Sequence, residues 1–217
     1  MNKTDITIVL DRSGSMLSVL DDAVNGFNQF IEDQKKVEGE ATVTLVQFDT
    51  VHEVVYKGKK LEDVPSLDLQ PRGFTALLDA VGKAIAEIGE HLKAMTEDDR
   101  PKQVIFVILT DGRENSSKEY SLQQVKQMIE HQTNVYKWQF VFLGANQDAI
   151  QVAGGMGISA GATMTYAATP EGTRDAFAAV SSGMSRYRMQ GHSQAVGGRY
   201  FNQDERDKAE VQPEDNT

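Results

Sequence analysis

Cysteine is absent from all 217 residues of the sequence. This absence excludes a disulfide framework and a thiolate metal site, and it is compatible with a reducing cytosol. No apolar run approaches the roughly 20 residues that a membrane span needs. Because the amino terminus enters its first strand-like segment within a few residues, it leaves no room for a signal peptide. We therefore expect a cytoplasmic protein with no membrane partner.

Positive charge is also scarce. The chain has 22 Lys and Arg against 32 Asp and Glu, a formal net charge of -10, which disfavours non-specific binding to nucleic acid. With 40% hydrophobic and 25% charged residues, the composition is that of an ordinary globular protein, and the length suits one domain. We predict a domain over residues 1–190 and a polar, disordered tail over residues 191–217, where the apolar pattern is lost.

Apolar residues recur every three or four positions in several stretches, which is the spacing of helices that pack on a sheet. The most regular stretch begins at Leu78 and ends at Met95. A final helix should open at Thr169, whose hydroxyl caps it, with Pro170 in the first turn. Helices are thus predicted over residues 20–31, 78–95, 120–131, 147–156 and from 169 onward.

Short runs rich in β-branched and aromatic residues alternate with these helices. The two runs at 40–49 and 51–57 have almost nothing between them, so they should form an antiparallel hairpin. The run at 104–110 is uninterrupted apolar, as in a strand buried on both faces. Strands are predicted over residues 6–10, 40–49, 51–57, 104–110, 137–143 and 158–166. Strands separated by helices predict a doubly wound α/β domain with a mostly parallel sheet and helices on both faces.

Oxygen-bearing side chains follow two of the predicted central strands. Asp11, Ser13 and Ser15 come directly after the first strand, and Asp111 follows the strand at 104–110. Thr75 precedes the most regular helix. In open parallel sheets, ligand sites lie at the carboxyl ends of the strands, where the winding reverses. Hydroxyl and carboxylate oxygens suit hard cations such as Mg²⁺. The sequence therefore predicts a divalent-metal site whose open position accepts an acidic residue from a partner protein.

These five residues, in this order and spacing, resemble the metal-ion-dependent adhesion site of von Willebrand factor A domains. The resemblance implies that Ser13, Ser15 and Thr75 bind Mg²⁺ or Mn²⁺ directly, while Asp11 and Asp111 act mostly through water. It also implies six strands in the order 3-2-1-4-5-6, with strand 3 antiparallel. The lack of cysteine and the short length resemble small cytosolic bacterial or phage members of this family. We expect this chain to be a binding module and not an enzyme.

Three arginines, Arg12, Arg72 and Arg113, lie within or beside the three predicted metal loops. One interpretation is ordinary solvated loop charge. The other is a basic rim that offsets the acidity of the domain and steers an acidic partner segment toward the metal.

Two other functions are compatible with a strand-end aspartate and a metal. A phosphohydrolase of a doubly wound fold uses such a site, but its motif resembles Asp-x-Asp, and Ser13 cannot serve as a general acid-base carboxylate. The second alternative is a structural subunit of a larger assembly in which the metal only stabilises the fold.

Overall fold

The computed structural model describes residues 3–145, 148–190 and 200–210. Within them, six strands form one sheet in the order β3-β2-β1-β4-β5-β6, with every neighbouring pair parallel except β2 and β3. This arrangement confirms the predicted doubly wound fold and the early hairpin. The strands are β1 (Lys3–Asp11), β2 (Glu40–Phe48), β3 (His52–Lys60), β4 (Gln103–Thr110), β5 (Gln139–Ala145) and β6 (Thr163–Tyr166).

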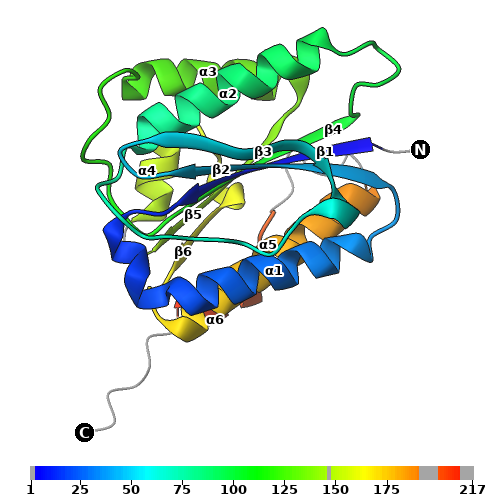
Figure 1. The fold of residues 1–217 in the computed structure, drawn as a ribbon. Coiled ribbons are helices and arrows are strands. Elements are labelled where there is room, and N and C mark those ends of the chain that lie inside the picture. Colours follow the sequence, from blue (N-terminus) through cyan, green and yellow to red (C-terminus); the bar gives the residue numbers. More distant parts are fainter. Residues whose placement is uncertain (1–2, 146–147, 191–199, 211–217) are drawn as a thin grey trace, which may run out of the picture.

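Helices cover both faces of the sheet (Figure 1). The longer ones are α1 (Leu20–Lys35), α2 (Leu77–Ala94), α3 (Leu122–Tyr136) and α5 (Pro170–Gln190); α4 (Ala149–Gly155) and α6 (Gln203–Glu210) are short. In Figure 1, α2 and α3 lie on one face, and α1 and α5 lie on the other. No helix in the described part of the chain combines the length and the apolar character needed to cross a membrane.

Most element boundaries fall within a few residues of the prediction. The Thr169 hydroxyl accepts a hydrogen bond from the Gly172 N–H at 3.1 Å, as expected of the helix cap. Two boundaries differ most: α3 ends at Tyr136 and not near His131, and β6 begins at Thr163 and not near Ile158. Residues 160–162 form a short 3-10 turn instead, because this Ala-Gly-Ala segment lacks the β-branched side chains that favour a strand.

The core follows from the strand patterns. Every residue of β4 is buried, as its uninterrupted apolar sequence predicts for a central strand. Trp138 and Phe140 pack against Phe106 of β4, with ring centroids 6.4 Å and 5.2 Å from it, and so belong to the core. The edge strand β3 alternates between half-buried and exposed residues.

The face covered by α1 and α5 is closely packed. Gly26 of α1 lies so near α5 that a Cβ there would be 2.5 Å from the Phe177 ring. The side-chain amide of Gln34 donates to the carbonyl oxygen of Ser181 at 3.0 Å. Arg188 of α5 donates to the carbonyl oxygens of Gln34 and Gly39, at 2.8 Å and 3.1 Å. Arg188 therefore satisfies carbonyl groups at and beyond the carboxyl end of α1.

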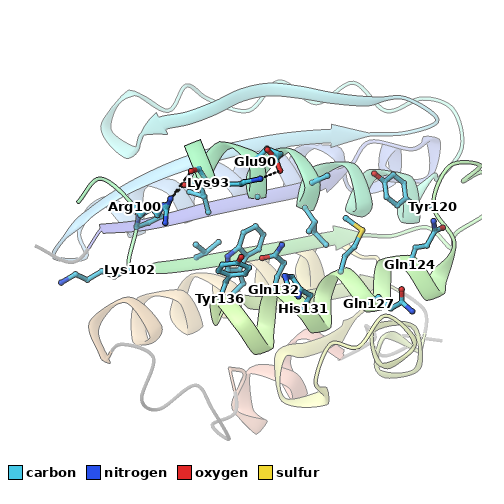
Figure 2. A pocket seen from close by; sticks show the side chains of 18 residues that line it. Glu90, Lys93, Arg100, Lys102, Tyr120, Gln124, Gln127, His131, Gln132 and Tyr136 are labelled. Carbon is cyan, nitrogen blue, oxygen red and sulfur yellow. Dashed lines mark hydrogen bonds and ion pairs between the residues drawn. The ribbon is translucent and has the colours of Figure 1, made fainter. Parts of the chain in front are cut away.

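The face covered by α2 and α3 has an open groove between the two helices, with a volume of about 780 Å³. Its lining includes apolar side chains such as Met128 and Trp138. Figure 2 shows Glu90 and Lys93 on the α2 side and His131 on the α3 side. Small residues of α2, among them Gly89, also line the groove and leave this space between the helices.

The prediction of a disordered tail is wrong for residues 200–210. Tyr200 and Phe201 are buried, and α6 follows directly. The ring of Tyr200 lies against Gly183 of α5, where a Cβ would be 2.5 Å from it. The Arg186 guanidinium binds both carboxylate oxygens of Glu205, at 2.7 Å and 2.9 Å. This segment is polar in sequence but is held by α5 and β6; residues 191–199 and 211–217 lie outside the described residues.

Candidate metal centre

The candidate site lies at the carboxyl edge of the sheet, between its two central strands. β1 and β4 are parallel neighbours, and Leu10 pairs with Leu109. Asp11, the last residue of β1, and Asp111, the residue after β4, therefore lie at nearly the same level. The chain winds in opposite directions from this pair, toward β2 and toward β5. It is therefore the point at which open α/β sheets place their ligands.

The loop after β1 brings its two serine hydroxyls together and joins them to the loop after β4. The Oγ atoms of Ser13 and Ser15 are 3.1 Å apart. Ser15 Oγ donates to Asp111 Oδ1 at 2.7 Å. Asp11 is held from both sides, since its carboxylate accepts the Ser13 N–H at 2.6 Å and the Thr110 hydroxyl at 2.5 Å. These bonds fix the Asp11 carboxylate beneath the loop.

Thr75 reaches the same point from the amino end of α2. A Cβ placed on Gly112 would lie 2.5 Å from Thr75 Oγ1 and 3.4 Å from Ser13 Oγ. The Thr75 hydroxyl therefore approaches the two other loops in a space that only glycine leaves open at position 112. The structure thus brings together all five residues that the sequence selected: Asp11, Ser13, Ser15, Thr75 and Asp111.

The two carboxylates lie where their charges are poorly solvated. Burial raises the pKa of Asp11, although hydrogen bonds from Thr110 and Ser13 oppose the rise. Burial raises the pKa of Asp111 to about 6; the Ser15 hydrogen bond lowers it, and the charge of Asp11 raises it further. Tyr166 is buried nearby, and its hydroxyl has no hydrogen-bond partner among the described residues. A cation between the carboxylates would relieve their mutual repulsion.

The donor set consists of hydroxyls as much as carboxylates. No group of three His, Cys, Asp or Glu side chains suited to a metal occurs in residues 3–145, 148–190 or 200–210. A metal at this edge would therefore depend on neutral oxygen donors from Ser13, Ser15 and Thr75. Such oxygens suit Mg²⁺ and Mn²⁺.

A buried ion-pair cluster around Asp49 ties the first two loops together, and sequence reasoning missed it. Asp49 Oδ2 accepts hydrogen bonds from Arg12 Nε and Arg72 Nε, each at 2.9 Å. Burial alone would raise the pKa of Asp49, but the bonds from Arg72 and Arg12 hold it below its ordinary value. The backbone adds support, because Arg72 N–H donates to the Arg12 carbonyl oxygen and Ala76 N–H to that of Asp49. One sequence feature could have pointed to Asp49: it is an aspartate at the carboxyl end of a strand, β2, just as Asp11 is at the carboxyl end of β1.

The predicted basic rim is accordingly wrong for Arg12. Its N–H bonds to the Phe48 carbonyl oxygen at 2.8 Å, which continues the β1 pairing and turns the side chain toward the β2–β3 turn. There Arg12 is 5% exposed and pairs with Asp49 and Glu53. Arg72 is largely exposed although it binds Asp49, and Arg113 is exposed. A rim could comprise only Arg72 and Arg113.

Asn115 is a second residue that sequence reasoning missed. Thr75 N–H donates to Asn115 Oδ1 at 3.0 Å, and Asn115 N–H donates to the Thr75 carbonyl oxygen at 3.1 Å. The preceding Glu114 accepts the Leu78 N–H at 2.9 Å, in the first turn of α2. The loop after β4 thereby holds the Thr75 backbone in place. No local pattern marks a pairing between residues 40 positions apart.

Comparison with known proteins gives one family. The sequence pattern of the von Willebrand factor type A domain matches residues 5–154, which include all five residues of the candidate site. A search of curated proteins finds no significant match.

Solved structures show the same fold at low sequence identity. One is proximal thread matrix protein 1 from the mussel byssus, with zinc in its metal-ion-dependent adhesion site (MIDAS) motif. It is 16% identical to this chain, with a TM-score of 0.62, and the match covers 85% of this chain and 46% of that one. The von Willebrand factor domain of the pilus tip protein Mfa5 from Porphyromonas gingivalis is 11% identical with a TM-score of 0.60, over 88% and 97%.

A von Willebrand factor type A protein from Catenulispora acidiphila is 17% identical with a TM-score of 0.58, over 87% of this chain and 43% of that one. This chain thus spans less than half the length of the mussel and Catenulispora chains. At these identities the likeness concerns the fold. Together with the match over residues 5–154, it shows that the chain belongs to the von Willebrand factor type A domain family.

Proposed function

We propose that this protein is a metal-dependent binding module, in which a Mg²⁺ or Mn²⁺ ion at a complete metal-ion-dependent adhesion site binds an acidic residue of a protein partner. The observation that carries the proposal is the convergence of five oxygen-bearing side chains from three separate segments. Metal-dependent protein interaction is what the family is known for.

The residues present fit a divalent cation. The hydroxyls of Ser13, Ser15 and Thr75 would hold the ion directly, and Asp11 and Asp111 would orient its water and hydroxyl ligands. Two carboxylates balance the charge of a dication, while the hydroxyls add none. The bound ion supplies a Lewis-acidic position that favours an incoming carboxylate. The zinc in the mussel protein's motif makes Zn²⁺ a third metal to compare.

The proposal is non-enzymatic. A phosphohydrolase would need a second carboxylate where Ser13 stands, and Ser13 instead lies beside Ser15 at 3.1 Å. Hydrolysis of a generic phosphate ester by the purified protein, lost in the Asp11→Asn variant, would establish the enzyme instead.

The module is further proposed to act within an intracellular, cytoplasmic assembly, which the absence of cysteine supports. Fractionation of the source cells followed by immunodetection tests this location.

A structural role for the metal makes a different prediction from a receptor role. Thr75→Ala should abolish partner binding without unfolding if the site is a receptor, and should mainly lower stability if the metal has a structural role.

Thermal unfolding with Mg²⁺ or with a chelator tests the proposal. At a metal concentration 100 times the Kd, binding stabilises the native state by about 2.7 kcal/mol, a rise in Tm of about 5–10 °C for a chain of this size. Ser15→Ala should lose this shift, because it removes one of the hydroxyl ligands proposed for the metal. Ser15 is exposed, so the change leaves no cavity in the core and the variant should still fold.

Ser18→Ala is the matched control, because Ser18 is an exposed serine on the same turn that hydrogen-bonds to the Ser15 carbonyl oxygen. It should keep the full shift. An absence of any shift for wild type at millimolar Mg²⁺ and Mn²⁺, or an equal shift for Ser15→Ala, would contradict the proposal.

A further inference from the structure

Large apolar side chains are exposed at the same edge of the sheet as the candidate metal centre. Among the described residues, those that are exposed at this edge follow β1, β2, β4 and β5 or precede α2: Leu17, Val51, Phe74, Leu122 and Ile150. Exposed apolar residues scattered singly need no explanation, but those within two positions of a site residue can form part of an interaction surface.

Two of them flank the centre directly. Leu17 is two residues beyond Ser15 and is 67% exposed; Phe74 adjoins Thr75 and is 66% exposed. Their loops are neighbours, because the Gly14 N–H donates to the Gly73 carbonyl oxygen at 3.3 Å. The two residues therefore lie on adjacent loops, each within two positions of an oxygen donor.

Neither side chain is needed to anchor its loop. The turn Gly14–Val19 already buries Met16 and Val19 in the core. On the other loop, Thr75 and the residues that follow it are buried while Phe74 is not. Leaving a Leu and a Phe in water forgoes the free energy that their burial would contribute. A partner that covers them recovers it.

The charges of this edge identify what the partner carries. Arg72 and Arg113 are exposed on two of the same loops, whereas the whole chain has a net charge of -10. Arg72 is paired with Asp49, and Asp11 and Asp111 would balance the charge of a dication. The attraction for a carboxylate would therefore come from the open position of the metal and from Arg113. The centre is thus complementary to a carboxylate, and the exposed Leu17 and Phe74 are complementary to apolar groups.

We propose that the partner segment presents its acidic residue with large apolar side chains next to it in sequence, which pack on Leu17 and Phe74. This inference rests on the proposed function and adds the composition of the bound segment. The occupant is a segment of another protein, and a second copy of this chain is an outcome of the test.

Selection from a displayed library of nine-residue peptides with a fixed central Asp tests the proposal. The full chain is immobilised in Mg²⁺, and bound peptides are released with EDTA. Leu, Ile, Phe, Tyr and Met should be enriched about tenfold beside the Asp over the unselected library. A synthetic peptide of the selected sequence then measures affinity for variants of the chain.

The double variant Leu17→Ser/Phe74→Ser should bind that peptide at least about tenfold more weakly and still show the wild-type Mg²⁺ shift in Tm. Val135→Ser/Met189→Ser is the matched control. It removes two exposed apolar side chains at the carboxyl ends of α3 and α5 and should leave affinity unchanged.

The two proposals fail in different ways. If Mg²⁺ does not raise the Tm of wild type, the proposed function falls and this inference falls with it. If the Mg²⁺ shift is present, the inference alone is overturned by any of three results: no EDTA-released peptide, no apolar preference beside the Asp, or equal affinity in Leu17→Ser/Phe74→Ser. A Mg²⁺-dependent dimer in sedimentation that the peptide cannot displace would assign the surface to a second copy.

Discussion

The two faces of the sheet differ in how their helices are held. On one face, α1 and α5 touch so closely that Gly26 has no room for a Cβ against Phe177. On the other face, α2 and α3 are separated by a groove of about 780 Å³, and a Cβ on Gly89 would meet only the Gln132 amide, at 3.7 Å. The first face is therefore sensitive to added volume, whereas the second has space to accept it.

Each face also buries an ionisable side chain, Arg188 on the α1/α5 face and Asp5 on the α2/α3 face. Gln103 belongs to the α1/α5 face, since its amide donates to the Tyr187 carbonyl oxygen of α5 and its Oε1 accepts the Thr4 hydroxyl. Asp5, the next residue along β1 from Thr4, points to the opposite face. It is buried and accepts only neutral hydroxyl bonds from Thr7 and Thr42. Arg188 on the α1/α5 face donates to carbonyl oxygens, although its Nε has no partner among the described residues. Asp5 on the α2/α3 face has neutral hydroxyl donors, so its burial in the charged form costs stability.

The largest effect is expected at Asp5. Burial raises its pKa from 3.8 to about 6, although Thr42, Thr7 and the charge of Lys57 oppose the rise. The native state thus binds more protons than the unfolded state between these values, so stability falls as pH rises through this range and stays reduced above it. Asp5→Asn removes this term. The stability of the variant relative to wild type should rise by about 2–3 kcal/mol from pH 4 to pH 8.

Urea unfolding at several pH values, with EDTA present throughout, measures this difference. Thr7 and Thr42 donate to different oxygens of Asp5. In the variant, one hydroxyl can still donate to the Asn amide oxygen and the other can accept from its NH2 group, so the folded structure should persist. A difference between variant and wild type that does not change with pH would refute the assignment.

The next effect is expected at Gly26. Gly26→Ala places a methyl group 2.5 Å from the Phe177 ring, and α1 or α5 must shift to accommodate it. Although alanine favours helix, we expect a net loss of about 1–3 kcal/mol in the free energy of unfolding, measured by urea denaturation. Adding Phe177→Leu should recover part of the loss, because it removes the ring that the methyl group meets. Equal stability of Gly26→Ala and wild type would show that this face is less rigid than described.

The smallest effect is expected in the groove. Gly89→Ala adds a methyl group with open space around it and should stabilise α2 by about 1 kcal/mol, seen as a higher urea midpoint. Gly82→Ala is the control on the same helix, where a Cβ would be 2.5 Å from the Tyr120 ring, and it should destabilise. If both changes act in the same direction, the difference between the groove and the packed part of α2 is not real.

Some residues of the candidate site can be recognised from the local sequence, and others cannot. Asp11, Ser13 and Ser15 lie on one turn, and their spacing is visible without any structure. Thr75 and Asp111 were found because each lies at a recognisable helix or strand end. Asp49 and Asn115 act through partners 23 to 40 positions away, so that no spacing in the sequence marks them.

What the sequence determined by itself was the alternation of strands and helices, the doubly wound sheet and the five oxygen donors. The reason is that periodic apolar residues fix which side of each element is buried, and strand ends fix where the loops emerge. Only the tertiary structure decided that Arg12 turns inward to Asp49 and that residues 200–210 pack on α5. Both outcomes depend on ion pairs between distant residues, Arg12 with Asp49 and Arg186 with Glu205, whose geometry exists only once the sheet has formed.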